Sequence, residues 1–263
     1  MALSSFSRLS AFSLSLDLCS STTTVDSVDQ FAVQQAVGQL LRLTGQLSVP
    51  ATWSTPETKH VGVVSKIRQA SRNHEIAIWG DADWTAAATP RHEFARELSR
   101  RVLAARAFGF ETTTLVFNSP ALPRHGNLLE RLGISATRCA RLVPTSRRAV
   151  GARSMREGLW EVPAASVFPS AGRWFSAATS SVNIRRAIDR TSATRDVYHL
   201  VVDVPRLAAG GNAAMRALQR IVLHAVQRRD ERRLQILTAA RITEQLGQSR
   251  AARPARSILR IAA

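Results

Sequence analysis

Polar side chains stand at the ends of several apolar runs that have the length and composition of β-strands. Carboxylates in such places can act as general bases or bind a divalent cation, and a histidine can transfer a proton. Each also has a structural explanation, because an aspartate can cap a loop, an arginine can pair with an acid and a histidine can be a satisfied core residue. The candidates are Asp17 at the end of the first run, Asp81 and Asp83 after the third, Arg138 at the end of the fifth, and His199 and Asp203 in and after the seventh.

The pattern of the chain predicts elements that would bring these residues together. Short apolar or β-branched runs alternate with segments of helical spacing, such as the stripe of Phe94, Leu98 and Val102. This alternation favours an α/β fold with parallel strands inside and helices outside, and seven or eight such units indicate a (β/α) barrel. The working residues of a barrel lie at the carboxyl ends of its strands. The predicted strands are 12–18, 49–53, 75–79, 112–117, 134–138, 159–162, 197–202 and 234–237.

The same pattern indicates one domain. Residues 1–246 are expected to form a single, distorted seven- or eight-stranded barrel. Within it, residues 139–196 are rich in Arg, Ser and Pro and are expected to form irregular loops around a short strand. Residues 247–263 are expected to be a basic C-terminal tail.

Several motifs occur in an order that is typical of one family. Pro50-Ala51-Thr52-Trp53 follows the first predicted helix, and His74-Glu75-Ile76-Ala77 opens the third predicted strand. Near the C-terminus come Tyr198 to Asp203, then Arg228-Arg229-Asp230, and then Leu234 to Thr238. In their order and spacing these motifs resemble those of the polysaccharide deacetylases of the NodB-homology superfamily, which are carbohydrate esterases. The resemblance covers nearly the whole chain, but the middle of the chain matches poorly.

The resemblance implies metal-assisted removal of an acetyl group from an N-acetylated sugar. In that family one Asp and two His hold a divalent metal, which polarises the amide carbonyl and activates a water molecule. A neighbouring Asp acts as the base, and a His near the C-terminus acts as the acid. By this pattern Asp17 stands at the base position, and His199 and Asp203 stand in the C-terminal motif.

The usual metal ligands of the family are replaced. Leu18 stands where the ligand Asp is expected, and Trp79 and Asp83 stand where the two ligand histidines are expected. An indole has no lone pair for a metal. Asp81 and Asp83 could form a different, oxygen-rich metal site. No cofactor follows from the sequence, and the candidate that remains is a divalent cation.

Two hypotheses follow from this pattern. The chain is a deacetylase-like hydrolase that acts on the amide C–N bond of N-acetylated sugars with a rebuilt site, or it is a catalytically inactive relative that binds a glycan or a protein partner. In either case, Trp84 and Trp160 could stack on sugar rings, and Arg138 at its strand end could contact the substrate. The fold class alone does not decide between an enzyme and a binding protein.

The charge of the chain bears only weakly on function. The 263 residues contain 36 Lys+Arg and 19 Asp+Glu, which gives a formal net charge of +17. Nearly all the excess follows residue 90, and it consists of dispersed arginines with no recognised nucleic-acid motif. A carbohydrate is therefore the expected partner and a nucleic acid is not.

The remaining composition argues against several protein classes. Two cysteines are too few for a disulfide framework. No apolar run reaches the 18 or so residues that a membrane span needs, so no transmembrane segment is predicted. The Ser-rich N-terminal segment lacks the continuous apolar core of a secretory signal. We therefore expect a cytoplasmic protein.

Overall fold

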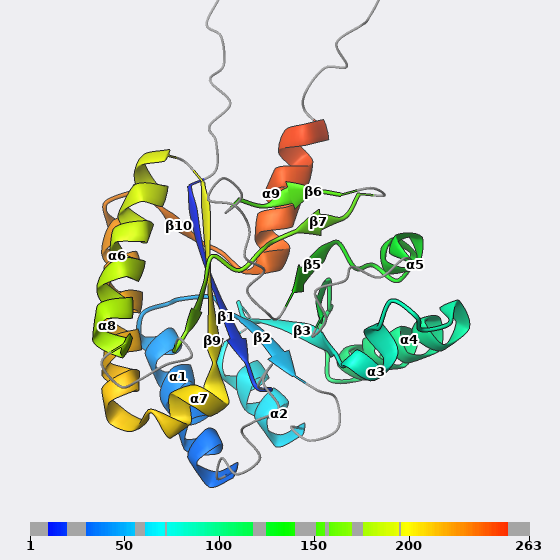
Figure 1. Ribbon diagram of the computed structural model, residues 1–263, viewed down its shortest axis with the longest axis horizontal. Coiled ribbons are helices and arrows are strands. Elements are labelled where there is room, and N and C mark those ends of the chain that lie inside the picture. The colour runs from blue at the N-terminus through cyan, green and yellow to red at the C-terminus, as the bar shows by residue number, and fades with distance from the viewer. Residues whose placement is uncertain are drawn as a thin grey trace, which may run out of the picture.

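A computed structural model gives the fold of the chain (Figure 1). It describes residues 10–19, 30–55, 61–71, 73–117, 125–139, 151–155, 158–169, 176–194 and 196–251. Trp174, one of the five tryptophans, lies outside these residues. Of the helices in this part of the chain, none combines the length and the apolar character that a membrane span requires.

The strands alternate with helices along most of the chain. The strands are β1 (Ala11–Asp17), β2 (Thr52–Thr55), β3 (Glu75–Gly80), β4 (Thr114–Phe117), β5 (Ala136–Cys139), β6 (Arg153–Ser154), β7 (Trp160–Glu161), β8 (Ser166–Phe168), β9 (Val197–Asp203) and β10 (Gln235–Ile236). The helices are α1 (Gln30–Gln46), α2 (Val61–Ala70), α3 (Ala82–Thr85), α4 (Arg91–Ala107), α5 (Gly126–Arg131), α6 (Ser176–Thr194), α7 (Val204–Ala209), α8 (Gly211–Asp230) and α9 (Ala239–Ala251).

All of these strands belong to one sheet, in the order β6-β7-β5-β4-β3-β2-β1-β9-β8, with β10 paired to β1. Every pairing is parallel except the one between β6 and β7. Helices cover the outer side of the sheet (Figure 1). Strands β1, β3 and β9 are buried along their whole length, as expected for parallel strands with both faces covered.

The two faces of the sheet differ in chemistry because side chains alternate along a strand. On β1, Phe12, Leu14 and Leu16 face outward and pack with residues of α1 and α8 in the main hydrophobic core. Ser13, Ser15 and the last residue of the strand lie on the other face, and they are also buried. At β1 the sheet therefore has an apolar outer face and a polar inner face.

The sheet is curled. A side chain of β5 contacts a side chain of β1, although β4, β3 and β2 lie between the two strands. Such a contact across the inner face requires the strands to bend round a common interior. The predicted α/β fold with parallel strands and outer helices is confirmed. In the described residues, the sheet ends at β6 and at β8 without pairing these edges, so it is a half-barrel rather than a closed ring.

Residues 139–196 contain more regular structure than the sequence indicated. The described part of this segment contains β6, β7, β8 and the 19-residue helix α6, where irregular loops around one short strand were expected. Helix α6 is rich in Ser, Thr and Arg and buries few apolar side chains, among them Ile184 and Ile188. The apolar stripe of this helix is therefore sparse in the sequence, which is why the sequence pattern did not predict a helix here. Similarly, α9 continues to Ala251, so the expected tail from residue 247 begins inside a helix, and residues 252–263 lie outside the described part.

At the amino-terminal end of the half-barrel, a buried carboxyl group links three strands to the start of α9. Glu75 Oε2 accepts hydrogen bonds from Thr52 Oγ1 at 2.9 Å and from the backbone N of Ala240 at 3.0 Å, and Oε1 accepts one from Thr114 Oγ1. Thr52 Oγ1 also accepts a hydrogen bond from the backbone N of Ala239. The first turn of α9 is therefore capped by side chains of β2 and β3, which satisfy N–H groups that have no partner within the helix.

Glu75 should make the stability of the protein depend on pH. Burial raises the pKa of this carboxyl above its ordinary value of 4.5. The stability that it contributes is therefore complete below pH 4.5 and is lost as the pH rises through the higher pKa of the folded state. Glu75→Gln keeps an acceptor oxygen but cannot ionise. We expect urea unfolding between pH 4 and 8 to show a smaller loss of stability with rising pH in this variant, whereas Glu244→Gln on the exposed face of α9 should match the wild type.

Candidate functional site

The carboxyl ends of β1, β2 and β9 place three polar side chains at one level. The strand register pairs Asp17 with Ser54 on β2 and with Asp203 on β9. Parallel neighbours in register present their side chains on the same face of a sheet. Ser54 Oγ donates a hydrogen bond to Asp17 Oδ1 over 2.5 Å. All three residues are buried.

Arg138 completes this group from the opposite side of the half-barrel. Its Nη2 lies 2.5 Å from Asp17 Oδ1, and the two side chains are only 2% and 5% exposed. Its Nη1 is also buried and has no hydrogen-bond partner among the described residues. A buried charge of this kind is tolerated only next to an opposite charge, because ion desolvation costs several kcal/mol. Asp17 therefore neutralises the buried charge of Arg138, and this ion pair lies at the middle of the site.

His199 lies beside this ion pair as a neutral side chain. Its Nδ1 is 3.1 Å from the carbonyl oxygen of Val162, which can only accept, so Nδ1 carries the ring proton. Its Nε2 then accepts from Ser15 Oγ at 2.7 Å. Burial, and after it the positive charge of Arg138, lowers the pKa of His199 from 6.5 to about 3. An imidazole bound in this way has no free proton to give to a substrate.

Asp203 begins a helix. Its side chain accepts a hydrogen bond from the backbone N of Arg206 at 3.0 Å, and its Oδ2 lies 3.5 Å from Arg206 Nε. This is the N-cap of α7, where Pro205 stands in the first turn. Asp203 therefore has a structural role as a helix cap. It lies with Asp17, Ser54 and Arg138 at the carboxyl ends of the strands, and this region is called the mouth of the half-barrel below.

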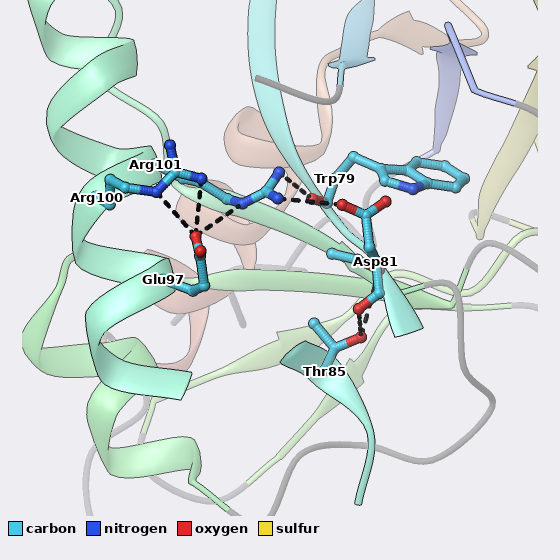
Figure 2. Close-up of polar contacts among 7 residues, drawn as sticks. Trp79, Asp81, Thr85, Glu97, Arg100 and Arg101 are labelled. Atoms are coloured by element: carbon cyan, nitrogen blue, oxygen red, sulfur yellow. Dashed lines mark hydrogen bonds and ion pairs between the residues drawn. The ribbon is translucent and has the colours of Figure 1, made fainter. Parts of the chain in front are cut away.

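Asp81 belongs to a separate cluster around Arg101 of α4 (Figure 2). Arg101 donates to Asp81 Oδ2 at 3.1 Å and to the carbonyl oxygen of Trp79 at 3.1 Å. Its guanidinium also lies 5.1 Å from the centre of the Trp84 ring. Asp81 is thus neutralised by an arginine, and Asp83 in the next short helix is exposed.

Gly80 is required where β3 meets this cluster. A Cβ at this position would lie 2.5 Å from Thr85 Cγ2 and 3.0 Å from the carbonyl oxygen of Val116. Thr85 Oγ1 donates to the carbonyl oxygen of Asp81 at 2.7 Å, and Figure 2 shows this contact. The turn after β3 is therefore tightly packed, which fixes the direction in which Asp81 leaves the strand.

Apolar side chains occupy two of the positions where the family has metal ligands. Trp79 is 2% exposed and packs with Ala77 and Val116, with Cys19 beside them. Leu18 is buried in the main hydrophobic core. Among the described residues, no group of three or more His, Cys, Asp or Glu could hold a metal ion. The residues present therefore do not fit the divalent metal that the resemblance implied.

The aromatic residues predicted to bind sugar differ in exposure. Trp84 is only 5% exposed and packs against Phe94, with ring centres 5.5 Å apart, so its ring offers little surface to a ligand. Trp160 lies in β7, next to β5, and is half-buried. Trp160 is therefore the better placed of the two to contact a ligand.

The structure brings together only part of the predicted set. Asp17 and Arg138 are in contact, His199 lies near them, and Asp203 pairs in register with Asp17. The sequence reasoning missed Ser15 and Ser54, which bind His199 and Asp17. Their inward positions on β1 and β2 were the available signal. Arg101 was missed because nothing in its helix distinguishes it from neighbouring arginines.

Solved structures share this fold. A protein from Mycobacterium smegmatis that is assigned as a polysaccharide deacetylase matches with a TM-score of 0.70 and 15% identity, over 97% of this chain and 95% of that chain. The Puue allantoinase matches with a TM-score of 0.69 and 12% identity, over 93% and 92%. A polysaccharide deacetylase assigned in Pseudomonas aeruginosa matches with a TM-score of 0.64 and 15% identity, over 92% of both chains.

No protein-family model and no curated protein matches the sequence of the chain. At the identities of the structural matches, the likeness concerns the fold alone. The chain has the fold of the polysaccharide deacetylases, in the divergent form that the sequence motifs predicted.

The Asp17–Arg138 pair should show strong energetic coupling. Arg138→Met leaves a buried carboxylate with Ser54 as its described partner, and should lower the free energy of unfolding by about 3–5 kcal/mol. The double variant Asp17→Asn/Arg138→Met should lose much less than the sum of the two single variants. Urea unfolding of all four proteins measures the coupling, and additive losses would contradict a direct ion pair.

His199 should make the protein less stable in acid. Its pKa of about 3 in the folded state lies below its ordinary 6.5, so the unfolded chain takes up a proton first as the pH falls. Its stability contribution is complete above pH 6.5 and is lost below it, by roughly 1 kcal/mol per pH unit. His199→Gln should reduce this slope in unfolding experiments between pH 6.5 and 4. The exposed His92→Gln variant should leave the slope unchanged.

Proposed function

We propose that the chain binds an N-acetylated glycan at the carboxyl ends of β1, β5 and β9 and does not carry out metal-assisted deacetylation. The observation that carries this proposal is the ion pair of Asp17 and Arg138. The carboxylate at the base position is bonded to a guanidinium and a hydroxyl. The neighbouring ligand positions of the family hold Leu18 and Trp79.

The chemistry of the mouth supports binding more than metal catalysis. A catalytic divalent ion needs about three protein ligands and an open position for water. Leu18 and Trp79 supply no such atoms, Asp81 is bound to Arg101, and Asp83 is exposed. The polar side chains at these strand ends, together with the partly exposed ring of Trp160 on β7, still suit a sugar, which presents hydroxyl groups at its edges and C–H groups on its faces.

A metal-independent amide hydrolase is the second candidate, and it is favoured by the position of Asp17. The two hydrogen bonds described for this carboxylate both fall on Oδ1. Oδ2 would be the oxygen that takes a proton from a water molecule. The bound, neutral state of His199 argues against this candidate, because the leaving amine would then need another proton donor.

Binding and turnover can be measured on the same protein. We expect isothermal titration calorimetry to detect binding of an N-acetylglucosamine oligomer, no stoichiometric metal in the purified protein, and no release of acetate. Trp160→Ala should weaken binding about 2- to 10-fold, the range of one aromatic contact. Phe31→Ala, which removes an aromatic ring that is 71% exposed on α1, is the matched control.

The outcomes separate the two candidates. Acetate release that persists in the presence of a chelator and disappears in Asp17→Asn would support the metal-independent hydrolase. Acetate release that requires added metal would overturn the proposal. Absence of binding to N-acetylated oligomers of any length would also overturn it.

A further inference from the structure

A large cavity lies at the amino-terminal end of the half-barrel, away from the mouth. It is partly open to solvent and has a volume of about 1250 Å³ between the C-terminal ends of α2 and α4, the start of β3 and the first turns of α9. This volume is larger than the ~300–1,000 Å³ of typical sites for small ligands. The cavity therefore has room for an oligomeric ligand. None of the residues placed at the mouth lines it.

The positive and negative side chains that line this cavity, apart from those of its buried floor, are equal in number. Arg68 and Arg241 stand against Glu111 and Glu244, and Arg241 Nη1 lies 2.6 Å from Glu244 Oε2. Arg68 Nη1 donates to the carbonyl oxygen of Phe108 over 2.5 Å. In a chain with a net charge of +17, a balanced rim is a local exception. Balanced charge favours a neutral ligand over a polyanion.

A tight turn presents two aromatic rings to the cavity. Phe108 is the C-cap of α4, Phe110 follows two residues later, and both side chains are half-buried. Gly109 between them has φ +78°, and a Cβ there would lie 2.6 Å from the guanidinium of Arg68. The turn therefore holds the arginine directly against the backbone between the two rings. This gives a fixed arrangement of apolar faces and hydrogen-bond donors.

The floor of the cavity contains a donor without a partner. His74 Nδ1 accepts from the backbone N of Ala51 at 3.2 Å, so the ring proton of the neutral imidazole is on Nε2. Nε2 is buried and has no hydrogen-bond partner among the described residues, and His74 as a whole is 6% exposed. This N–H group is closed to solvent inside the floor, so the other side chains of the lining are the ones that would contact a ligand.

We infer that this cavity is a second carbohydrate site, which binds a neutral oligosaccharide of several sugar units. Phe108 and Phe110 would contact the C–H faces of the rings, and Arg68 and the side chains of α2 would bind hydroxyl groups. Hydroxyl groups can accept as well as donate, which matches the mixture of Arg, Glu, Gln69 and Ser65 along the cavity. The site goes beyond the proposed function, since it is separate from the mouth and needs no N-acetyl group.

The test uses a neutral glucan hexamer without acetyl groups, with binding measured by titration calorimetry. The full chain should bind it, and Phe108→Ala should weaken the affinity about 2- to 10-fold. Ser65→Trp, which fills the cavity from α2 and keeps both aromatic rings, should abolish binding. Lys66→Ala on the same helix does not line the cavity and should bind as the wild type does. Thermal unfolding of each variant shows whether it is folded.

The mouth and the cavity can be distinguished by their ligands. Asp17→Asn should leave binding of the glucan hexamer unchanged, and so should an increase in NaCl from 50 to 500 mM. The inference is overturned if the glucan does not bind while the N-acetylated oligomer does, or if Ser65→Trp binds the glucan normally. A steep loss of affinity with salt would also overturn it, because that response marks an anionic ligand or a charge-driven contact.

Discussion

The ion pair between Arg138 and Asp17 is the interaction on which the rest of the structure depends. Both side chains are almost fully buried, and a charge in such a place must be neutralised nearby. The two residues come from β5 and β1, which are separated by three strands in the sheet. The pair can form only if the sheet curls, so the electrostatic requirement and the half-barrel shape support each other. The same ion pair includes the carboxylate that the sequence motifs place at the position expected for a base.

The inner face of the sheet combines a network of hydrogen bonds with a small apolar cluster of Ala77, Trp79 and Val116. The outer face carries the large aliphatic and aromatic core, which packs against the surrounding helices. On the inner face, serines and threonines bind the titratable groups, and burial sets the charge state of those groups. Polar networks of this kind specify one arrangement strongly when they are satisfied. The buried polar residues described on this face include Ser13, Ser15, Asp17, Thr52, Ser54, Glu75, Thr114, Arg138, His199 and Asp203.

Much of the fold could be predicted from the sequence, because parallel strands buried on both faces appear as short apolar runs between helical stripes. The position of Asp17 at a strand end followed from the same pattern. Its pairing with Arg138 could not be predicted, since 121 residues separate the two and strand order is not visible in a single sequence. Trp84 shows a second limit. From the sequence, an aromatic residue in a polar loop is equally consistent with binding a ligand and with packing in the core. The contact of Trp84 with Phe94 shows that it belongs to the core.

The capping of α9 by β2 and β3 has a consequence for how the chain folds. Thr52 accepts a hydrogen bond from the backbone N of Ala239, 187 residues later in the sequence, and Glu75 accepts one from the backbone N of Ala240, 165 residues later. The first strand likewise lies between β2 and β9, so one of its two long edges is completed only by residues near position 200. Contacts of such long sequence separation slow folding. During synthesis, the base of the half-barrel would therefore stay open, with Glu75 lacking its partner in α9, until residues 239 and 240 have left the ribosome.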